Sequence, residues 1–393
     1  MNILVLTPIY PGPGIGKNFT KVVHYFVKEW MNIGENIQVI HLPSYFPKII
    51  YNVPKCASDF LFKKLGFELP KIRISKIEAL EVENVPVYRI PLYKLHPWSV
   101  VSESYRSKAV ECIVKYLEGK NFKPDLIVAH WFDPQLYFID ALKKRYNCKA
   151  SMVVHDRPFK YAKYINAPDV WGYRKVSTPK EFEKLFPSVK FSFRCMSGIP
   201  SYYLDNIPER NWDSIKNFIY VGTLIKRKYA DTVLYSLMNS NIKNFKFNII
   251  GEGPLHEKIN GIIKNNGLTS TVNLLGRIDR SAIISYLDQS DIFVMISSEE
   301  VFGLVYIEAM ARGCIVIASK KEGMEGIIHH GENGFLVTAG DEQELTEMIN
   351  HINKMSAKER GIISKRAIET AKGMTDYKVA YEYLNMVKSA IYE

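Results

Sequence analysis

The sequence predicts an α/β protein built from two doubly wound domains, and three observations carry this prediction. Short apolar runs of strand length alternate with amphipathic segments of helix length, which is the pattern of a parallel sheet covered by helices. The alternation occurs twice along a chain of 393 residues, a length that exceeds one typical core. A polar, proline-containing stretch at 202–213 separates the two series and is therefore the predicted linker.

The first domain is expected over residues 1–205. Buried strands are predicted at 2–6, 37–42, 125–129 and 150–154, with helices at 19–31, 102–117 and 135–145 between them. Residues that follow such strands share one edge of the sheet, where doubly wound proteins bind ligands.

The second domain is expected over residues 206–375. Strands are predicted at 218–222, 245–250, 272–275, 292–296 and 315–318, again separated by helical segments, and a last helix is predicted at about 376–391. Because ligands bind beyond the carboxyl ends of the strands, the active site is expected in the cleft between the two domains.

Composition narrows the class of protein. The chain has 52 basic and 41 acidic residues, a net charge of +11 that fits nucleic acid, anionic lipid or a phosphorylated substrate. Its five scattered cysteines include no C-x-x-C pair, which argues against a disulfide framework or a zinc knuckle and favours the cytoplasm. No apolar stretch approaches the ~20 residues of a membrane span, and the N-terminal run has the length of a strand, not of a secretory leader. We expect a soluble protein, cytoplasmic or peripheral on the inner face of the cell membrane.

The segment 300–308 is the most informative part of the chain. Glu300 precedes a glycine turn at Gly303, and Glu308 lies within the helix that follows. The backbone N–H groups of Phe302, Gly303 and Leu304 would point from the helix start, where the macrodipole favours an anion. Carboxylates accept hydrogen bonds from paired hydroxyls, so the two glutamates suit sugar and ribose better than phosphate. The combination predicts a nucleotide-sugar site.

These residues, together with Glu-Ala-Met-Ala at 308–311 and Gly-Glu-Asn-Gly-Phe-Leu-Val at 331–337, resemble the retaining GT-B glycosyltransferases. This is the E-x7-E group, which includes sucrose synthase-like and bacterial polysaccharide-building enzymes. The resemblance is dense after residue 215 and thin before it. It implies two Rossmann-like domains that face an interdomain cleft, with the segment 376–393 crossing back to the acceptor-side N-terminal domain. It also implies a UDP- or GDP-sugar as donor and no cofactor.

The loop after the first strand of the second domain is expected to hold the diphosphate. Similar enzymes have arginine directly after the glycine that is Gly222 here, and a lysine at the position of Lys228. Thr223 replaces that arginine, and Lys226 or Arg227 could compensate. The alternative is a solvated basic helix start.

Two further loops resemble donor-binding parts of the family. Gly253, in the segment 249–255, resembles the loop that lines the nucleoside, although a plain strand-to-helix turn would look the same. Arg277, after Gly276, resembles the residue beside the base, with an ordinary surface arginine as the alternative.

In the first domain the resemblance assigns a role to His155, which follows a buried strand and would contact donor sugar or acceptor. His130 has a similar position with weaker support, and a structural histidine is the alternative for both. The glycine-rich loop at 11–19 satisfies neither a Walker nor a dinucleotide motif. In the resembling enzymes this loop approaches phosphate and acceptor, and Gly16 is the residue carried over.

No Asp-x-Asp pair occurs, so no metal is expected, and the departing diphosphate would depend on Lys228 and the helix start after Gly303. Aromatic and lysine residues interleave at 45–51 and 60–65, a composition typical of a surface that binds anionic membranes. An ordinary packed insertion is the alternative.

The sequence thus predicts a hexosyltransferase that moves a sugar from a nucleoside diphosphate to a glycan hydroxyl, lipid-linked in a bacterial surface polysaccharide pathway. Lys228 would hold the diphosphate, Glu300 the sugar hydroxyls and Glu308 the ribose. A sugar epimerase or a phosphorylase of the same frame is the alternative enzyme. Nucleic acid binding is disfavoured because the lysines are dispersed and no recognition motif occurs. A nicotinamide oxidoreductase would need a G-x-G-x-x-G after a strand, which is missing.

Overall fold

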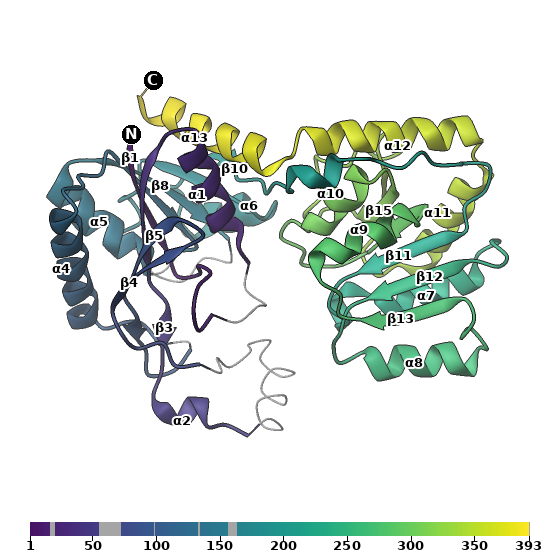
Figure 1. Ribbon diagram of the computed structural model, residues 1–393, viewed down its shortest axis with the longest axis horizontal. Coiled ribbons are helices and arrows are strands. Elements are labelled where there is room, and N and C mark those ends of the chain that lie inside the picture. The colour runs from purple at the N-terminus through teal and green to yellow at the C-terminus, as the bar shows by residue number, and fades with distance from the viewer. Residues whose placement is uncertain (16–19, 55–71, 98, 133, 156–162, 393) are drawn as a thin grey trace. The chain divides into compact units, whose positions relative to one another are not determined.

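The computed structural model describes residues 1–15, 20–54, 72–97, 99–132, 134–155 and 163–392 (Figure 1). The chain divides into two compact units. The first unit comprises Met1–Cys195 and Ala380–Glu393, and the second comprises Met196–Val379. Each contains its own largely parallel sheet flanked by helices, so the predicted α/β class with two Rossmann-like domains is confirmed.

The first unit is organised around an eight-stranded sheet of order β10-β9-β8-β7-β1-β2-β5-β4. Its strands are β1 (Asn2–Thr7), β2 (Asn36–His41), β4 (Glu78–Val82), β5 (Val85–Arg89), β7 (Leu126–His130), β8 (Lys149–Val154), β9 (Val170–Tyr173) and β10 (Phe191–Arg194). A separate pair joins β3 (Ser44–Tyr45) to β6 (Leu92–Tyr93). The helices are α1 (Val22–Asn32), α2 (Lys48–Tyr51), α4 (Glu103–Gly119), α5 (Gln135–Tyr146) and α6 (Thr178–Leu185). Every ladder of the large sheet is parallel except that of the edge hairpin β4–β5.

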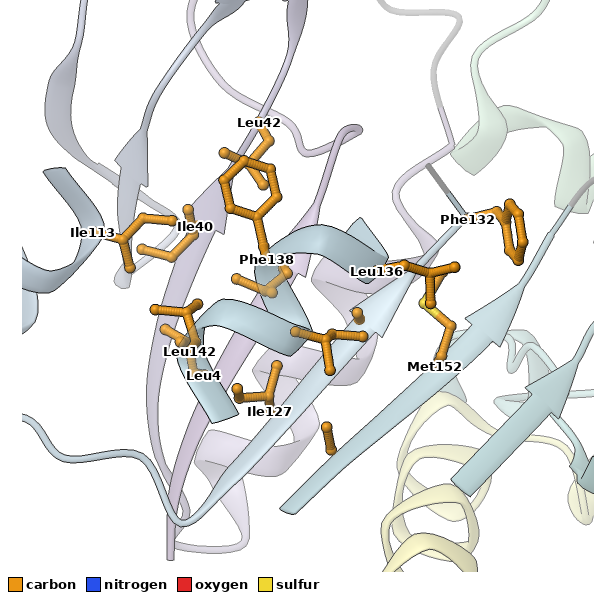
Figure 2. Packing of buried hydrophobic residues seen from close by; sticks show 14 of the residues in the cluster. Leu4, Ile40, Leu42, Ile113, Ile127, Phe132, Leu136, Phe138, Leu142 and Met152 are labelled. Atoms are coloured by element: carbon orange, nitrogen blue, oxygen red, sulfur yellow. The ribbon is translucent and has the colours of Figure 1, made fainter. Parts of the chain in front are cut away.

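The core of the first unit forms where α5 covers the central strands (Figure 2). Leu4 of β1 and Ile127 of β7 face Phe138 and Leu142 of α5, and all four side chains are fully buried. Strands buried on both faces require near-continuous apolar runs, which is why these segments were recognisable as strands. The packing fixes the carboxyl ends of β7 and β8, where His130 and His155 lie.

The C-terminal helix α13 (Asp376–Tyr392), drawn in yellow in Figure 1, packs its later turns on the first unit. The Trp30 indole N–H donates to the Ala380 carbonyl at 2.8 Å, and Lys388 pairs with Glu35 at 2.6 Å. The Tyr383 ring contacts the rings of Phe26 and Trp30. Residues from the two ends of the chain therefore share one core.

The second unit contains a six-stranded parallel sheet of order β13-β12-β11-β14-β15-β16. Its strands are β11 (Asn217–Val221), β12 (Lys246–Ile250), β13 (Val272–Gly276), β14 (Ile292–Val294), β15 (Ile315–Ser319) and β16 (Phe335–Val337). Its helices are α7 (Ala230–Asn239), α8 (His256–Asn265), α9 (Arg280–Asp288), α10 (Leu304–Ala311), α11 (Glu342–Lys354) and α12 (Ala357–Lys372). The order reverses between β11 and β14, and this switch point is where such sheets bind ligands.

The polar stretch 202–213, predicted as a linker, is fastened to the second unit. Arg312 is 3% exposed and donates to the carbonyls of Tyr203, Asp205 and Asn206. Arg210 in turn donates to the Arg312 carbonyl at 2.6 Å. Buried guanidinium groups need many acceptors, and the polar stretch supplies them as backbone carbonyls. The division of the chain accordingly falls earlier, between Cys195 and Met196.

The described residues contain no helix that is both long enough and apolar enough to cross a bilayer. Within the same residues Cys112, Cys148, Cys195 and Cys314 are free thiols.

Candidate functional site

The centre of the candidate site is an ion pair between Lys228 and Glu300 in the second unit. Lys228 ends a 3-10 turn (Lys226–Lys228) that follows β11, and Glu300 lies in the loop that follows the adjacent strand β14. The Lys228 Nζ donates to Glu300 Oε2 at 2.9 Å, and each side chain is 14% exposed. A cation and a carboxylate, predicted as separate ligands of one donor, are thus in direct contact at the switch point of the sheet.

Glu300 is held in place by the residues around it. The Ser297 hydroxyl donates to Glu300 Oε2 at 3.3 Å. The carboxylate of Glu322, in the loop after β15, accepts the backbone N–H groups of Glu299 at 2.9 Å and Glu300 at 2.8 Å. Glu322 was not predicted as a site residue, because nothing in its sequence spacing shows which loop it faces. It acts by fixing the backbone from which the Glu300 side chain projects.

Gly303 forms the sharp turn between this loop and α10. Its φ is +82°, and a Cβ atom at this position would lie 2.5 Å from the Tyr306 ring. The Tyr306 hydroxyl donates to the Met295 carbonyl at 2.8 Å inside the core, which holds the ring against Gly303. Leu304 begins the helix and Phe302 is buried, as the turn requires. In the first turn of α10 the Tyr306 N–H donates to the Gly303 carbonyl at 3.0 Å. The helix N-terminus carries a partial positive charge and lies near Glu300, whose Cγ is 3.4 Å from the position of an added Gly303 Cβ.

Glu308 lies inside α10 and is 4% exposed. Its Oε1 accepts a hydrogen bond from Arg280 Nε at 2.7 Å, and the Arg280 Nη2 atom of the same ion pair lies 2.5 Å away. Burial raises the pKa of Glu308, and Arg280 acts in the opposite direction. Arg280 was missed in the sequence because a lone arginine at a helix start has no distinguishing pattern. Its guanidinium also lies 5.8 Å from the centre of the Tyr203 ring.

The glycine loops after β11 and β12 touch each other. The Gly222 N–H donates to the Ile250 carbonyl at 2.9 Å, and the Gly251 N–H donates to the Gly276 carbonyl at 2.7 Å. A Cβ on Gly251 would lie 1.9 Å from the Gly222 carbonyl oxygen, and one on Gly253 would lie 2.5 Å from that of Leu224. These glycines therefore bring the loop backbones together, which is a structural reason for their presence.

The remaining predicted donor residues lie around these loops. Thr223 is exposed directly after Gly222, and Arg277 is exposed directly after β13. Lys226 is exposed. The Arg227 guanidinium donates to the Ser298 carbonyl at 3.2 Å, so Arg227 braces the loop that carries Glu300.

The first unit holds His155 and His130 side by side. His155 follows β8, His130 ends β7, and His130 Nδ1 lies 2.9 Å from His155 Nε2. Trp131, at a φ of +73°, stacks on the His155 ring with centres 4.0 Å apart. Gly16 lies outside the described residues.

The surroundings of both histidines favour the neutral imidazole. Burial is the main cause that lowers the pKa of His130 to about 3, and the Arg174 guanidinium adds to it. Burial, Arg174 and His130 together hold the pKa of His155 well below its usual value.

These shifts predict that acid weakens the fold. Below pH ~6.5 the unfolded chain binds a proton that the buried His130 imidazole does not, so His130 contributes stability above that pH which is lost as pH falls toward 3. The lowered pKa of His155 acts in the same direction. We expect the His130 contribution to the urea-derived free energy of unfolding to fall by about 2 kcal/mol between pH 7.5 and pH 5. His130→Gln should reduce this slope, whereas the exposed His329→Gln should leave it unchanged. An equal slope in His130→Gln and the wild type would contradict the prediction.

No cluster of three or more His, Cys, Asp or Glu side chains arranged to hold a metal ion occurs among the described residues.

Comparison with known proteins places this site in context. Residues 207–371 match the family model of glycosyl transferases group 1. An uncharacterized glycosyltransferase of Methanocaldococcus jannaschii is 27% identical over 240 residues, which cover 61% of this chain and 61% of that protein. An amylovoran biosynthesis glycosyltransferase of Erwinia amylovora is 31% identical over 119 residues, 29% of each chain. The matched regions thus span less than two thirds of these relatives.

Among solved structures, the Anabaena protein HepE in complex with UDP superposes with a TM-score of 0.67 at 16% identity, covering 99% of this chain and all of that one. At this identity the likeness concerns the fold. The segment 207–371 includes Lys228, Glu300 and Glu308. The chain therefore has the GT-B fold, and its second unit contains a segment that matches the glycosyl transferases group 1.

Proposed function

We propose that this protein is a retaining glycosyltransferase that moves a hexose from a UDP- or GDP-sugar to a hydroxyl of a growing glycan. The observation that carries the proposal is the contact between Lys228 and Glu300 at the start of α10. A cation and a helix N-terminus suit the charged phosphates of such a donor, and a carboxylate in the same pair of loops suits the hydroxyl groups of its sugar.

In this assignment Lys228 and the N–H groups at the start of α10 bind the diphosphate, and Glu300 accepts from the sugar hydroxyls. Glu308 accepts hydrogen bonds from the ribose hydroxyls with its carboxylate, whose Oε1 also accepts from Arg280. Binding of the phosphates gives Lys228 a second anion to neutralise, so the donor is expected to lengthen the 2.9 Å contact to Glu300.

The transfer breaks the bond between the sugar C1 and the phosphate oxygen and forms a bond from C1 to the acceptor oxygen on the same face. The acceptor proton passes to the departing phosphate oxygen, and the electron pair of the broken bond stays on the diphosphate. Lys228 stabilises that developing charge, the kind of electrostatic contribution that dominates many enzymatic rate enhancements. No metal is assigned a role, and a chelator should leave the rate unchanged.

We assign the acceptor to the first unit. This unit contains His155 and Gly16, the two residues to which the resemblance gives a role near the acceptor. The name of the Erwinia relative supports a polysaccharide product, and the UDP bound to the Anabaena protein supports a uridine donor.

We also propose that the first unit approaches an anionic lipid surface that presents a lipid-linked acceptor. Ile49 of α2 is 76% exposed and follows the exposed Lys48, and Ile72 is 58% exposed beside Arg73. Apolar side chains flanked by cations bind anionic interfaces. The other predicted part of this surface, 60–65, lies outside the described residues. Vesicles of phosphatidylglycerol should sediment the protein and those of phosphatidylcholine should not; equal recovery with both would remove the membrane proposal.

A thermal-shift panel of UDP- and GDP-sugars tests the donor, since a ligand that binds only the folded state raises the melting temperature. The donor that raises it should then be converted with an acceptor, and the anomeric configuration of the product read by NMR. Retained configuration supports the proposal, and inverted configuration contradicts the retaining mechanism. Epimerised donor in the absence of any acceptor would favour the epimerase instead.

A further inference from the structure

Three buried polar side chains of the first unit contact one another in series, as a hydrogen-bonded row. Tyr383 of α13 is 1% exposed, His130 is fully buried and His155 is 6% exposed. The Tyr383 hydroxyl oxygen lies 3.3 Å from His130 Nε2, and His130 Nδ1 lies 2.9 Å from His155 Nε2. Both ring nitrogens of His130 are therefore engaged, one toward the C-terminal helix and the other toward His155.

The neutrality of His130 couples its two hydrogen bonds. A neutral imidazole has one N–H donor and one acceptor nitrogen. If Nε2 of His130 accepts a hydrogen bond, its Nδ1 must carry the proton and donate to His155. The group that contacts Nε2 of His130 thus determines which nitrogen of His155 is protonated.

Tyr383 determines which atom donates in each of these two hydrogen bonds. Burial is the main cause that raises the pKa of Tyr383 well above its usual value, so the phenol keeps its proton. An imidazole nitrogen is a better acceptor than a phenol oxygen, and the Tyr383 O–H therefore donates to His130 Nε2. His130 then donates from Nδ1 to His155 Nε2, which leaves Nδ1 as the only N–H of His155.

Packing against neighbouring aromatic rings holds His130 and His155 in the orientations that these two hydrogen bonds need. Trp131 stacks on His155 at an interplanar angle of 14°, and Phe26 stacks on His130 at 23°. The Tyr383 ring meets the His130 ring edge-on at 88°. A change at Tyr383 would accordingly alter the position of protons more readily than the position of the rings.

We propose that Tyr383 is a positioning residue that fixes His155 as the Nδ1–H tautomer, so that His155 offers a hydrogen-bond donor, and not a base, to a substrate oxygen. The part that concerns substrate rests on the proposed function. The tautomer itself does not, because it follows from contacts within the first unit.

NMR of the full-length chain labelled with 15N-histidine tests the tautomer directly. We expect His155, assigned through His155→Gln, to show a pyrrole-type nitrogen at Nδ1 and a pyridine-type nitrogen at Nε2. Tyr383→Phe removes the donor and should shift this pattern toward Nε2–H. Tyr392→Phe, on the same helix but 53% exposed, should not. An Nε2–H tautomer in the wild type, or an unchanged pattern in a folded Tyr383→Phe, would overturn the proposal. Should Tyr383→Phe fail to fold, the wild-type spectrum still decides.

A kinetic measurement with the donor found in the thermal-shift panel tests the consequence. Loss of one hydrogen bond made in the transition state should lower kcat about tenfold in Tyr383→Phe and leave KM nearly unchanged. An unchanged kcat despite a shifted tautomer would refute the catalytic part. A wild-type chain that transfers no sugar would contradict the proposed function while the tautomer result stands.

Discussion

Lys228→Met is expected to lower kcat by about 10²–10³-fold, the loss typical of removing one group that stabilises charge developing in the transition state. The charge on the diphosphate grows as the bond to the sugar breaks, and Lys228 is the cation in contact with Glu300 in the donor site. Binding of the intact donor uses further contacts, so KM should change less than kcat. Initial rates measured against donor concentration separate the two.

The matched control is Lys226→Met, which removes an exposed lysine from the same 3-10 turn. It should stay within about twofold of the wild type, as surface substitutions usually do. Equal losses in the two variants would mean that general basicity near the loop matters and that Lys228 has no special role. Glu300→Gln should also reduce the rate, because it removes the charged carboxylate that is assigned to the sugar hydroxyls and that contacts Lys228 in the absence of donor.

Gly303→Ala is expected to lower the free energy of unfolding of the second unit by about 2–4 kcal/mol and to abolish donor binding. Part of the loss comes from the left-handed backbone, whose φ is +82°, and the rest from overlap with Tyr306, whose ring lies 2.5 Å from the added Cβ. Urea unfolding followed by circular dichroism measures the loss, and the thermal shift with the donor measures binding.

Gly331→Ala separates these two causes. Gly331 has nearly the same backbone, with a φ of +79°, but an added Cβ would meet nothing within 4 Å. It should lose only the backbone part, about 1–2 kcal/mol, and keep donor binding. A Gly303→Ala protein as stable as Gly331→Ala would show that Tyr306 yields, against the contacts of its hydroxyl with Met295 and Ser297.

The sequence alone predicted the elements whose burial is continuous and whose turns require glycine. The central strands of both sheets and the start of α10 after Gly303 are of this kind, since apolar runs and a positive φ leave a local signature. The edge hairpin β4–β5 was missed. Its two-residue turn, Glu83–Asn84, uses positive φ values without a glycine, and its strands carry charged residues.

The candidate site was predictable only in part, for a related reason. Lys228, Glu300 and Gly303 follow strands, so sheet topology brings them to one edge. Glu322 and Arg280 act through contacts between loops distant in sequence, which no local pattern encodes. The roles given to the predicted residues stay predictions until a donor is bound.

The return of the last residues to the first unit has a consequence for synthesis on the ribosome. The Ala380 carbonyl is the acceptor of the buried Trp30 indole, and Tyr383 packs on Phe26. The second unit is continuous from Met196 to Val379 and can acquire all its strands while the peptide is still attached. The first unit, although its strands emerge earlier, stays without its closing helix until the residues that follow Val379 have emerged, so a nascent chain should protect the segment 196–379 from protease first.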